Sequence, residues 1–248
     1  MAKEASEVKE TLNGEDLFRL HWTLDGPLET AISVMPNAYY DPDELESARS
    51  PYARAASDGG APTLHPISPE TITNPPVSTL TVSVSELNQW EDNWLMVHEC
   101  HSDPDKDPEG NWGPAPAGAD ADASAGDSES NDKLHLLRCC GEERPWDPDN
   151  ASLTVQPSGD MITIHDFVSQ VHPWLMGMRR DLVQAAAYTY AQGEALPPDT
   201  QLLVVPHLGS VSVLPKDEWA KEHRDRELGT PLMMPISHCP HRHRLTER

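Results

Sequence analysis

The strongest pattern of apolar positions in the chain lies between residues 163 and 190. Thr163, with Asp166 three residues later, matches the capping box that opens many helices. Gln192-Gly193 is typical of a helix end, whereas Pro173 lacks the amide hydrogen that a helix interior requires. We therefore predict one long helix that is kinked at Pro173 or restarts there. Its apolar face, at steps of three and four residues, consists of Ile164, Phe167, Val168, Val171, Trp174, Leu175, Met178, Leu182, Val183, Ala186, Ala187 and Tyr190.

Shorter apolar runs predict strands. The run 93–100 is apolar at both alternating positions, which indicates a central strand, and we expect it to pair with 134–140 across an expanded loop. We expect residues 216–228 to form a shorter helix that packs through Trp219. We predict an α+β fold, in which one main helix packs on a face of an antiparallel sheet of roughly five to seven strands, with long proline-rich loops. The other predicted strands are 17–24, 29–35, 79–84, 153–155, 201–205 and 210–214.

Composition indicates a single domain. The 248 residues include 24 prolines and 14 glycines and are 37% hydrophobic, which leaves too little apolar material for two cores. The segment 102–132 is rich in Asp, Pro, Gly, Ala and Ser and predicts a disordered acidic insertion. We expect a flexible N-terminus at 1–16, the domain at 17–228, and a flexible tail rich in His, Arg and Pro at 229–248.

The charge balance narrows the range of partners. A net charge of −23 disfavours binding to nucleic acid or to an anionic membrane, because both require clustered Lys and Arg. A basic protein partner, or a contribution to solubility alone, fits better. We find no secretory leader, no apolar run of about 20 residues, and no spacing of the four cysteines that indicates a secreted disulfide framework. These features predict an intracellular protein, cytoplasmic or nuclear, and nothing indicates its oligomeric state.

Several short segments resemble an uncharacterised fungal domain family. They are the proline pair and strand at 75–82, Trp146 ahead of the strand 153–155, and Gly159 followed by Ile162-Thr163-Ile164 and Asp166 at a helix start. His21-Trp22-Thr23-Leu24 is similar to a strand near the beginning of such domains. The resemblance covers most of 20–175 apart from the insertion, and Pro173-Trp174 departs from it. It implies a shared small α+β fold and a fungal source, but no activity.

Histidines and cysteines of the predicted strands are candidate metal ligands. His98 and Cys100 share one face of their strand, and His135 and Cys139 share one face of theirs. If the strands pair, these four residues form a tetrahedral two-His, two-Cys site of the kind that binds zinc. The alternative is that a half-buried sheet face simply accommodates small thiols and hydrogen-bonded imidazoles.

A second group of candidate metal ligands lies in the tail. His238, Cys239, His241 and His243 form the densest cluster of such side chains in the chain. Accidental affinity for divalent metals is the alternative to a dedicated site there.

His165, Asp166 and His172 also allow an acid–base site. A structural capping role explains Asp166 better. We find none of the sequence motifs of common enzyme classes, which favours a non-catalytic protein and leaves a metal-dependent enzyme as the alternative.

Tryptophan is unusually frequent, with seven residues against two phenylalanines. The indoles either line a ligand cleft or peptide-binding face or fill a small core; we assign Trp94, Trp174 and Trp219 to the core and Trp112 to the disordered insertion. Two classes of function remain. The preferred one is a non-catalytic binding or protein-interaction module, and the alternative is a small metal-binding protein or metal-dependent enzyme that uses the candidate His and Cys ligands.

Overall fold

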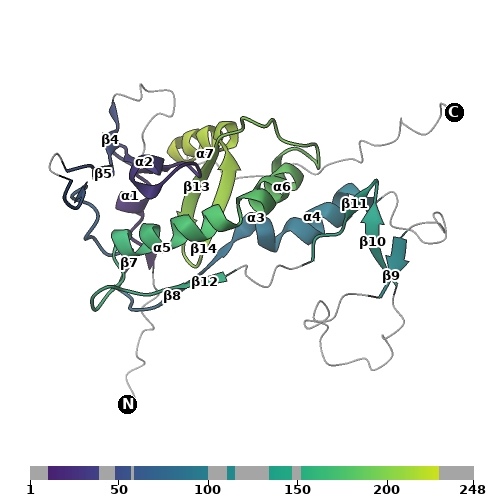
Figure 1. The fold of residues 1–248 in the computed structure, drawn as a ribbon, viewed down its shortest axis with the longest axis horizontal. Helices are drawn as coiled ribbons and strands as arrows, with labels where there is room; N and C mark the ends of the chain where they lie inside the picture. Colours follow the sequence, from purple (N-terminus) through teal and green to yellow (C-terminus); the bar gives the residue numbers. More distant parts are fainter. Residues whose placement is uncertain are drawn as a thin grey trace, which may run out of the picture.

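The computed structural model of the protein describes residues 11–38, 48–56, 59–99, 111–114, 134–146 and 152–228. These ranges form an α+β fold, as predicted (Figure 1). The helices are α1 (Gly14–Leu17), α2 (Leu28–Ala31), α3 (Ser85–Asn88), α4 (Trp90–Val97), α5 (Ile164–Gly177), α6 (Arg179–Tyr190) and α7 (Lys216–Leu228). The strands are β1 (Thr11–Leu12), β2 (Leu20–Trp22), β3 (Ile32–Val34), β4 (Ser50–Pro51), β5 (Ala53–Arg54), β6 (Thr63–Leu64), β7 (Thr73–Asn74), β8 (Leu80–Val84), β9 (Asn111–Gly113), β10 (His135–Cys139), β11 (Glu142–Glu143), β12 (Ser152–Val155), β13 (Leu202–His207) and β14 (Ser210–Pro215).

The largest sheet has four strands in the order β12-β8-β14-β13. The pairs β12–β8 and β13–β14 are antiparallel, but β14 runs parallel to β8, so the sheet is mixed. Parallel neighbours require a crossover, and here the connection from β8 to β14 contains α5 and α6. The predicted strands 17–24, 29–35 and 134–140 contain β2, β3 and β10, which lie in the smaller sheets β2–β3–β4 and β9–β10–β11, so the main sheet is smaller than expected. The start of 29–35 belongs to the helix α2 and not to a strand.

The long predicted helix consists of α5 and α6, which cross in front of the main sheet (Figure 1). The capping box at its start is present, with the Asp166 N–H donating to Thr163 Oγ1 at 3.1 Å and the Thr163 N–H to the Asp166 carboxylate at 3.0 Å. The helix neither ends nor restarts at Pro173; α5 continues to Gly177, and Met178 separates it from α6. Glycine is a poor helix former, which explains a break at this point.

The core lies between these helices and the main sheet. Val171 and Leu175 of α5 are 0% exposed. Trp94 and Trp219 are also buried, as predicted, whereas Trp174 is only partly buried and packs against the core from its edge.

The prediction of a strand at 93–100 was wrong, because α4 occupies most of this segment. Trp90, Trp94 and Val97 are spaced by four and three residues, which places them on one helical face, and Trp94 is 1% exposed. Met96 is 50% exposed, so the run is not buried on all sides. Periodicity alone does not separate a short buried strand from a buried helical turn. Strand β10 consequently pairs with β9 and β11 and not with residues 93–100.

Two segments expected to be flexible contain ordered structure. Residues 111–113 of the predicted insertion form β9, which pairs with β10 through Trp112 opposite Leu136. Residues 11 and 12 form β1, which pairs with β7, and α1 follows directly. Composition does not predict either strand, because a strand of two or three residues is stabilised mainly by its pairing partner and has no distinctive local sequence. Residues 1–10, 102–110, 115–132 and 229–248 lie outside the described residues.

The small β9–β10–β11 sheet lies at the far end of α4 from the main sheet (Figure 1). Its packing partners are Trp94 and Leu95 of α4 and Tyr188 of α6, which form a separate hydrophobic cluster with Leu136 and Cys139. Among the described residues, no helix has the length and apolar character needed to cross a membrane.

Candidate functional site

The candidate site lies where the end of α4 meets the β10–β11 hairpin. His98 follows the last residue of α4, and its side chain is 2% exposed. Cys139 is the last residue of β10 and is buried, and Cys140 follows it and is exposed. Ligand atoms of these three side chains all lie within 4.8 Å of one another. We refer to these three residues as the His/Cys cluster.

A tight hairpin turn places the two cysteines side by side. Cys139 pairs with Glu142 across the hairpin, so the loop consists of Cys140 and Gly141. Their φ angles are 52° and 89°. Positive φ at both loop residues defines the type I′ turn, in which Asn-Gly is the preferred pair. Cys140 therefore adopts a left-handed conformation that costs an ordinary side chain about 1 kcal/mol or more.

The spacing within the His/Cys cluster matches tetrahedral metal coordination. The two sulfur atoms lie 3.7 Å apart. Two thiolates bound at about 2.3 Å to one tetrahedral zinc are separated by about 3.8 Å. The cluster thus combines one imidazole and two thiols, the donor types that zinc prefers, and the two sulfur atoms already have the separation of a tetrahedral site.

A hydrogen bond sets the orientation and tautomer of His98. Its Nδ1 lies 2.8 Å from the backbone carbonyl oxygen of Trp94. A carbonyl oxygen only accepts, so Nδ1 carries the proton and Nε2 carries the ring lone pair, the donor with which a neutral imidazole binds metals. Histidines that bind metals generally donate their other N–H to a carbonyl or carboxylate in this way.

Aromatic side chains surround the cluster. The His98 ring lies 4.3 Å from the Trp94 ring and 6.2 Å from the Tyr188 ring, centroid to centroid. The Tyr188 hydroxyl donates to the Glu142 carboxylate. Burial raises the pKa of Tyr188 well above its usual range, and the Glu142 hydrogen bond and the nearby cysteines raise it further. Tyr188 therefore stays neutral and acts as a hydrogen-bond donor beside the cluster.

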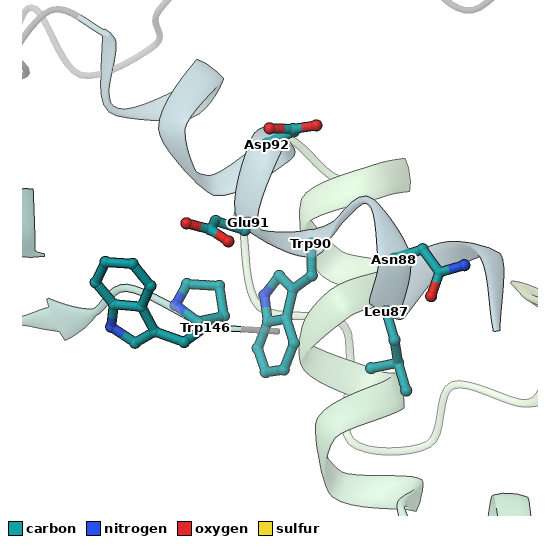
Figure 2. A pocket seen from close by; sticks show the side chains of 7 residues that line it. Leu87, Asn88, Trp90, Glu91, Asp92 and Trp146 are labelled. Atoms are coloured by element: carbon teal, nitrogen blue, oxygen red, sulfur yellow. The ribbon is translucent and has the colours of Figure 1, made fainter. Parts of the chain in front are cut away.

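Helix α4 packs against the β10–β11 hairpin and the residues that follow it, and a pocket lies at the other end of this contact from the His/Cys cluster. Trp90 begins α4, about 12 Å along the helix axis from His98. Its indole and that of Trp146 line the pocket, and Figure 2 shows the Glu91 carboxylate above them in this view. Leu87, Asn88, Asp92 and Pro145 complete the lining. We call this cavity of about 120 Å³ the indole pocket.

An ion pair joins the two walls of the indole pocket. The Arg144 Nε donates to Glu91 Oε1 at 2.8 Å, and the guanidinium carbon lies 4.4 Å from the centre of the Trp146 ring. Arg144 is only 10% exposed, so this pair is better shielded from solvent than an ordinary surface pair. Helix α4 and the hairpin segment are thus connected at one end by the ion pair and at the other by the His/Cys cluster.

The structure brings together only some of the predicted ligands. His98 and Cys139 belong to the cluster, and Cys140 joins them although the sequence analysis left it out. His135 lies four residues from Cys139, about 13 Å along an extended strand, and its ring instead contacts Trp146 at 6.0 Å. Cys140 went unnoticed because strand alternation places it on the opposite face from Cys139, whereas the turn at 140–141 brings the two sulfur atoms together. A Cys-Cys-Gly sequence directly after a strand was the available signal for this turn.

The other predicted ligands are outside the described residues. They are Cys100 and the tail residues His238, Cys239, His241 and His243. Their participation in metal binding stays a prediction.

Asp166 and His172, the residues of the predicted acid–base site, form hydrogen bonds that stabilise the fold. The Asp166 carboxylate accepts from the N–H groups of Thr163 and Ser158, at 3.0 and 3.1 Å. His172 Nδ1 accepts from the Trp22 indole at 3.0 Å, and its Nε2 donates to the Gly26 carbonyl oxygen at 3.0 Å. Asp166 therefore stabilises the start of α5, in agreement with the capping interpretation, and His172 stabilises the core.

Comparisons with family models, curated proteins and solved structures find no match to this chain. The resemblance to a fungal domain family therefore stays a prediction, and the site is interpreted from its own geometry.

Proposed function

We propose that the protein is a zinc-binding interaction module. In this proposal, His98, Cys139 and Cys140 bind zinc and fasten the β10–β11 hairpin to α4. The fastened elements present the indole pocket to a protein partner. The observation that carries the proposal is the approach of one imidazole and two thiols to within 4.8 Å, with the sulfur atoms 3.7 Å apart.

The conformation of Cys140 supports a ligand role over a packing role. Its side chain is exposed, so burial in a core does not explain the thiol at this position. Its φ of 52° favours Asn or Gly over other residues. A metal bond would offset the conformational cost, because metal binding stabilises the folded state that presents the ligands.

The burial of the His/Cys cluster favours a structural metal, for which these residues supply three of the four ligands of a tetrahedral site. His98 and Cys139 are buried under Trp94 and Leu136, which leaves the thiol of Cys140 as the exposed member of the cluster. The metal would act as a staple for a three-stranded sheet that has a small apolar cluster of its own. It would hold in place both walls of the indole pocket.

The test is zinc stoichiometry of the purified full chain, measured by native mass spectrometry before and after chelator treatment. We expect one zinc per chain in the unmodified protein and none in C140N. Asparagine is favoured at this turn position, so the substitution preserves the hairpin and removes only the ligand. Loss of zinc from C140N therefore does not result from unfolding.

Two controls separate the cluster from other histidines. H135A changes a histidine of β10 that lies apart from the cluster, and we expect it to retain zinc. A variant with C239S and H241A reports on the tail, and we expect it to retain one zinc as well. A metal-free unmodified protein, or a C140N variant that keeps its zinc, would overturn the proposal.

A further inference from the structure

The indole pocket has the size of a small cationic head group. Its volume is about 120 Å³, and cavities of about 150 Å³ accept a benzene ring. A trimethylated ammonium is about as bulky as benzene, so the pocket is of the right scale for such a group although smaller than that cavity. The pocket is open to one side, where a partner side chain can enter, since Trp90, Glu91 and Trp146 are partly exposed.

The lining of the indole pocket favours positive charge. Trp90 and Trp146 supply two aromatic faces, and Glu91 and Asp92 supply two carboxylates, of which Glu91 is already paired with Arg144. The negative face of an indole attracts a cation, and a desolvated cation gains most. The net charge of −23 adds a long-range attraction for a basic partner.

Arg144 already shows the same arrangement within the chain. Its guanidinium lies over Trp146 while it donates to Glu91. An indole and a carboxylate of this surface therefore hold a cation together. Because Glu91 Oε1 is occupied by Arg144, the site is better suited to a compact ammonium than to an arginine that requires a complete carboxylate for two parallel hydrogen bonds.

A larger cavity that Trp90 also lines is less suited to a cation. Its volume is about 400 Å³, and it contains Arg180 as well as Glu142 and Glu143. The Glu142 carboxylate there also accepts from Tyr188. The indole pocket therefore has the clearer preference for a positively charged group.

We infer that the indole pocket binds the ammonium group of a lysine side chain from a basic partner protein, more tightly when that lysine is trimethylated. A quaternary ammonium has no N–H groups to desolvate and gains fully from the indole faces. This inference rests on the proposed function, because it names the partner chemistry of the surface that the zinc holds in place.

The test uses three forms of the peptide acetyl-Ala-Lys-Ala-amide: trimethyllysine, unmodified lysine, and the neutral carbon analogue of trimethyllysine. Binding to the full chain is followed by the ¹⁵N-indole resonances at low salt. We expect the trimethyllysine peptide to bind about tenfold more tightly than the neutral analogue, as one cation–π contact implies. Equal binding of the charged and neutral peptides would overturn the inference.

Variants locate the site. W146L and D92N should each weaken trimethyllysine binding severalfold, and W90L about tenfold. D181N, which removes an exposed carboxylate of α6, should have no effect. Unchanged affinity in both W146L and D92N would place the binding elsewhere and overturn the inference.

Zinc content is measured in the same samples, so that a failure of the zinc proposal can be distinguished from a failure of the lysine-binding inference. Retained zinc in the unmodified protein without preference for the charged peptide contradicts the inference alone. Charge-dependent peptide binding by a protein that never carries zinc contradicts the proposed function alone.

Discussion

The buried carboxyl group of Glu86 gives the clearest stability prediction. Glu86 lies on α3 and is 2% exposed. Its two oxygens accept hydrogen bonds of 2.8 Å, one from the Tyr190 hydroxyl and one from the Val213 N–H. Burial raises the pKa of Glu86 from 4.5 to about 7, although both hydrogen bonds lower it, and the nearby Glu222 adds a small further increase.

The sign of the pH effect follows from this raised pKa. The folded protein keeps the Glu86 proton up to about pH 7, whereas the unfolded chain releases it near 4.5. The stabilising contribution is therefore complete below pH 4.5 and is lost as the pH rises through 7. At 1.36 kcal/mol per pKa unit, the loss amounts to about 3 kcal/mol.

The substitution E86Q isolates this contribution. The glutamine amide keeps an acceptor for the Val213 N–H and supplies a donor for the Tyr190 oxygen, and it does not ionise. We expect E86Q and the unmodified protein to be similar in stability at pH 5, and E86Q to be more stable by about 2 to 3 kcal/mol at pH 8.

Urea denaturation at pH 5, 6, 7 and 8 measures this difference. The control is E194Q, which changes an exposed carboxylate and should give no pH-dependent difference. A difference between E86Q and the unmodified protein that stays constant from pH 5 to pH 8 would refute the reasoning.

Three further predictions concern the framework of the fold. V171D buries an unpaired charge beneath the sheet, and urea denaturation should show a free energy of unfolding lower by about 3 kcal/mol or more. Q184D, at an exposed position of α6, should be nearly neutral. D166A removes the capping box and should cost about 1 to 2 kcal/mol by the same measurement; a neutral effect would contradict the capping role. W112A opens the cluster beside Trp94 and should lower the thermal midpoint, and an unchanged midpoint would show that β9 contributes nothing to stability.

Local signals explain which parts of the fold were predictable. The capping box at Thr163 and Asp166, the stop at 192–193 and the hairpin of β13 and β14 each depend on residues close in sequence, and all three are present. Helix α4 was misassigned because its eight residues satisfy two periodicities at once.

Tertiary contacts explain why the site was predicted only in part. The indole pocket depends on residues 90 and 146, which are distant in sequence and meet only through the packing of α4 against the hairpin segment. Likewise, the proximity of His98 to Cys139 was expected from a strand pairing that does not form. The actual contact runs from a helix end to a turn, which alternation along strands does not anticipate.

X-ray absorption at the zinc edge of the zinc-loaded full chain tests the central claim most directly. The proposal predicts at least two sulfur neighbours at about 2.3 Å and imidazole scattering, with one sulfur fewer in C140N when zinc is supplied in excess. A shell made only of nitrogen and oxygen at about 2.0 to 2.1 Å would contradict the His/Cys cluster as the metal site.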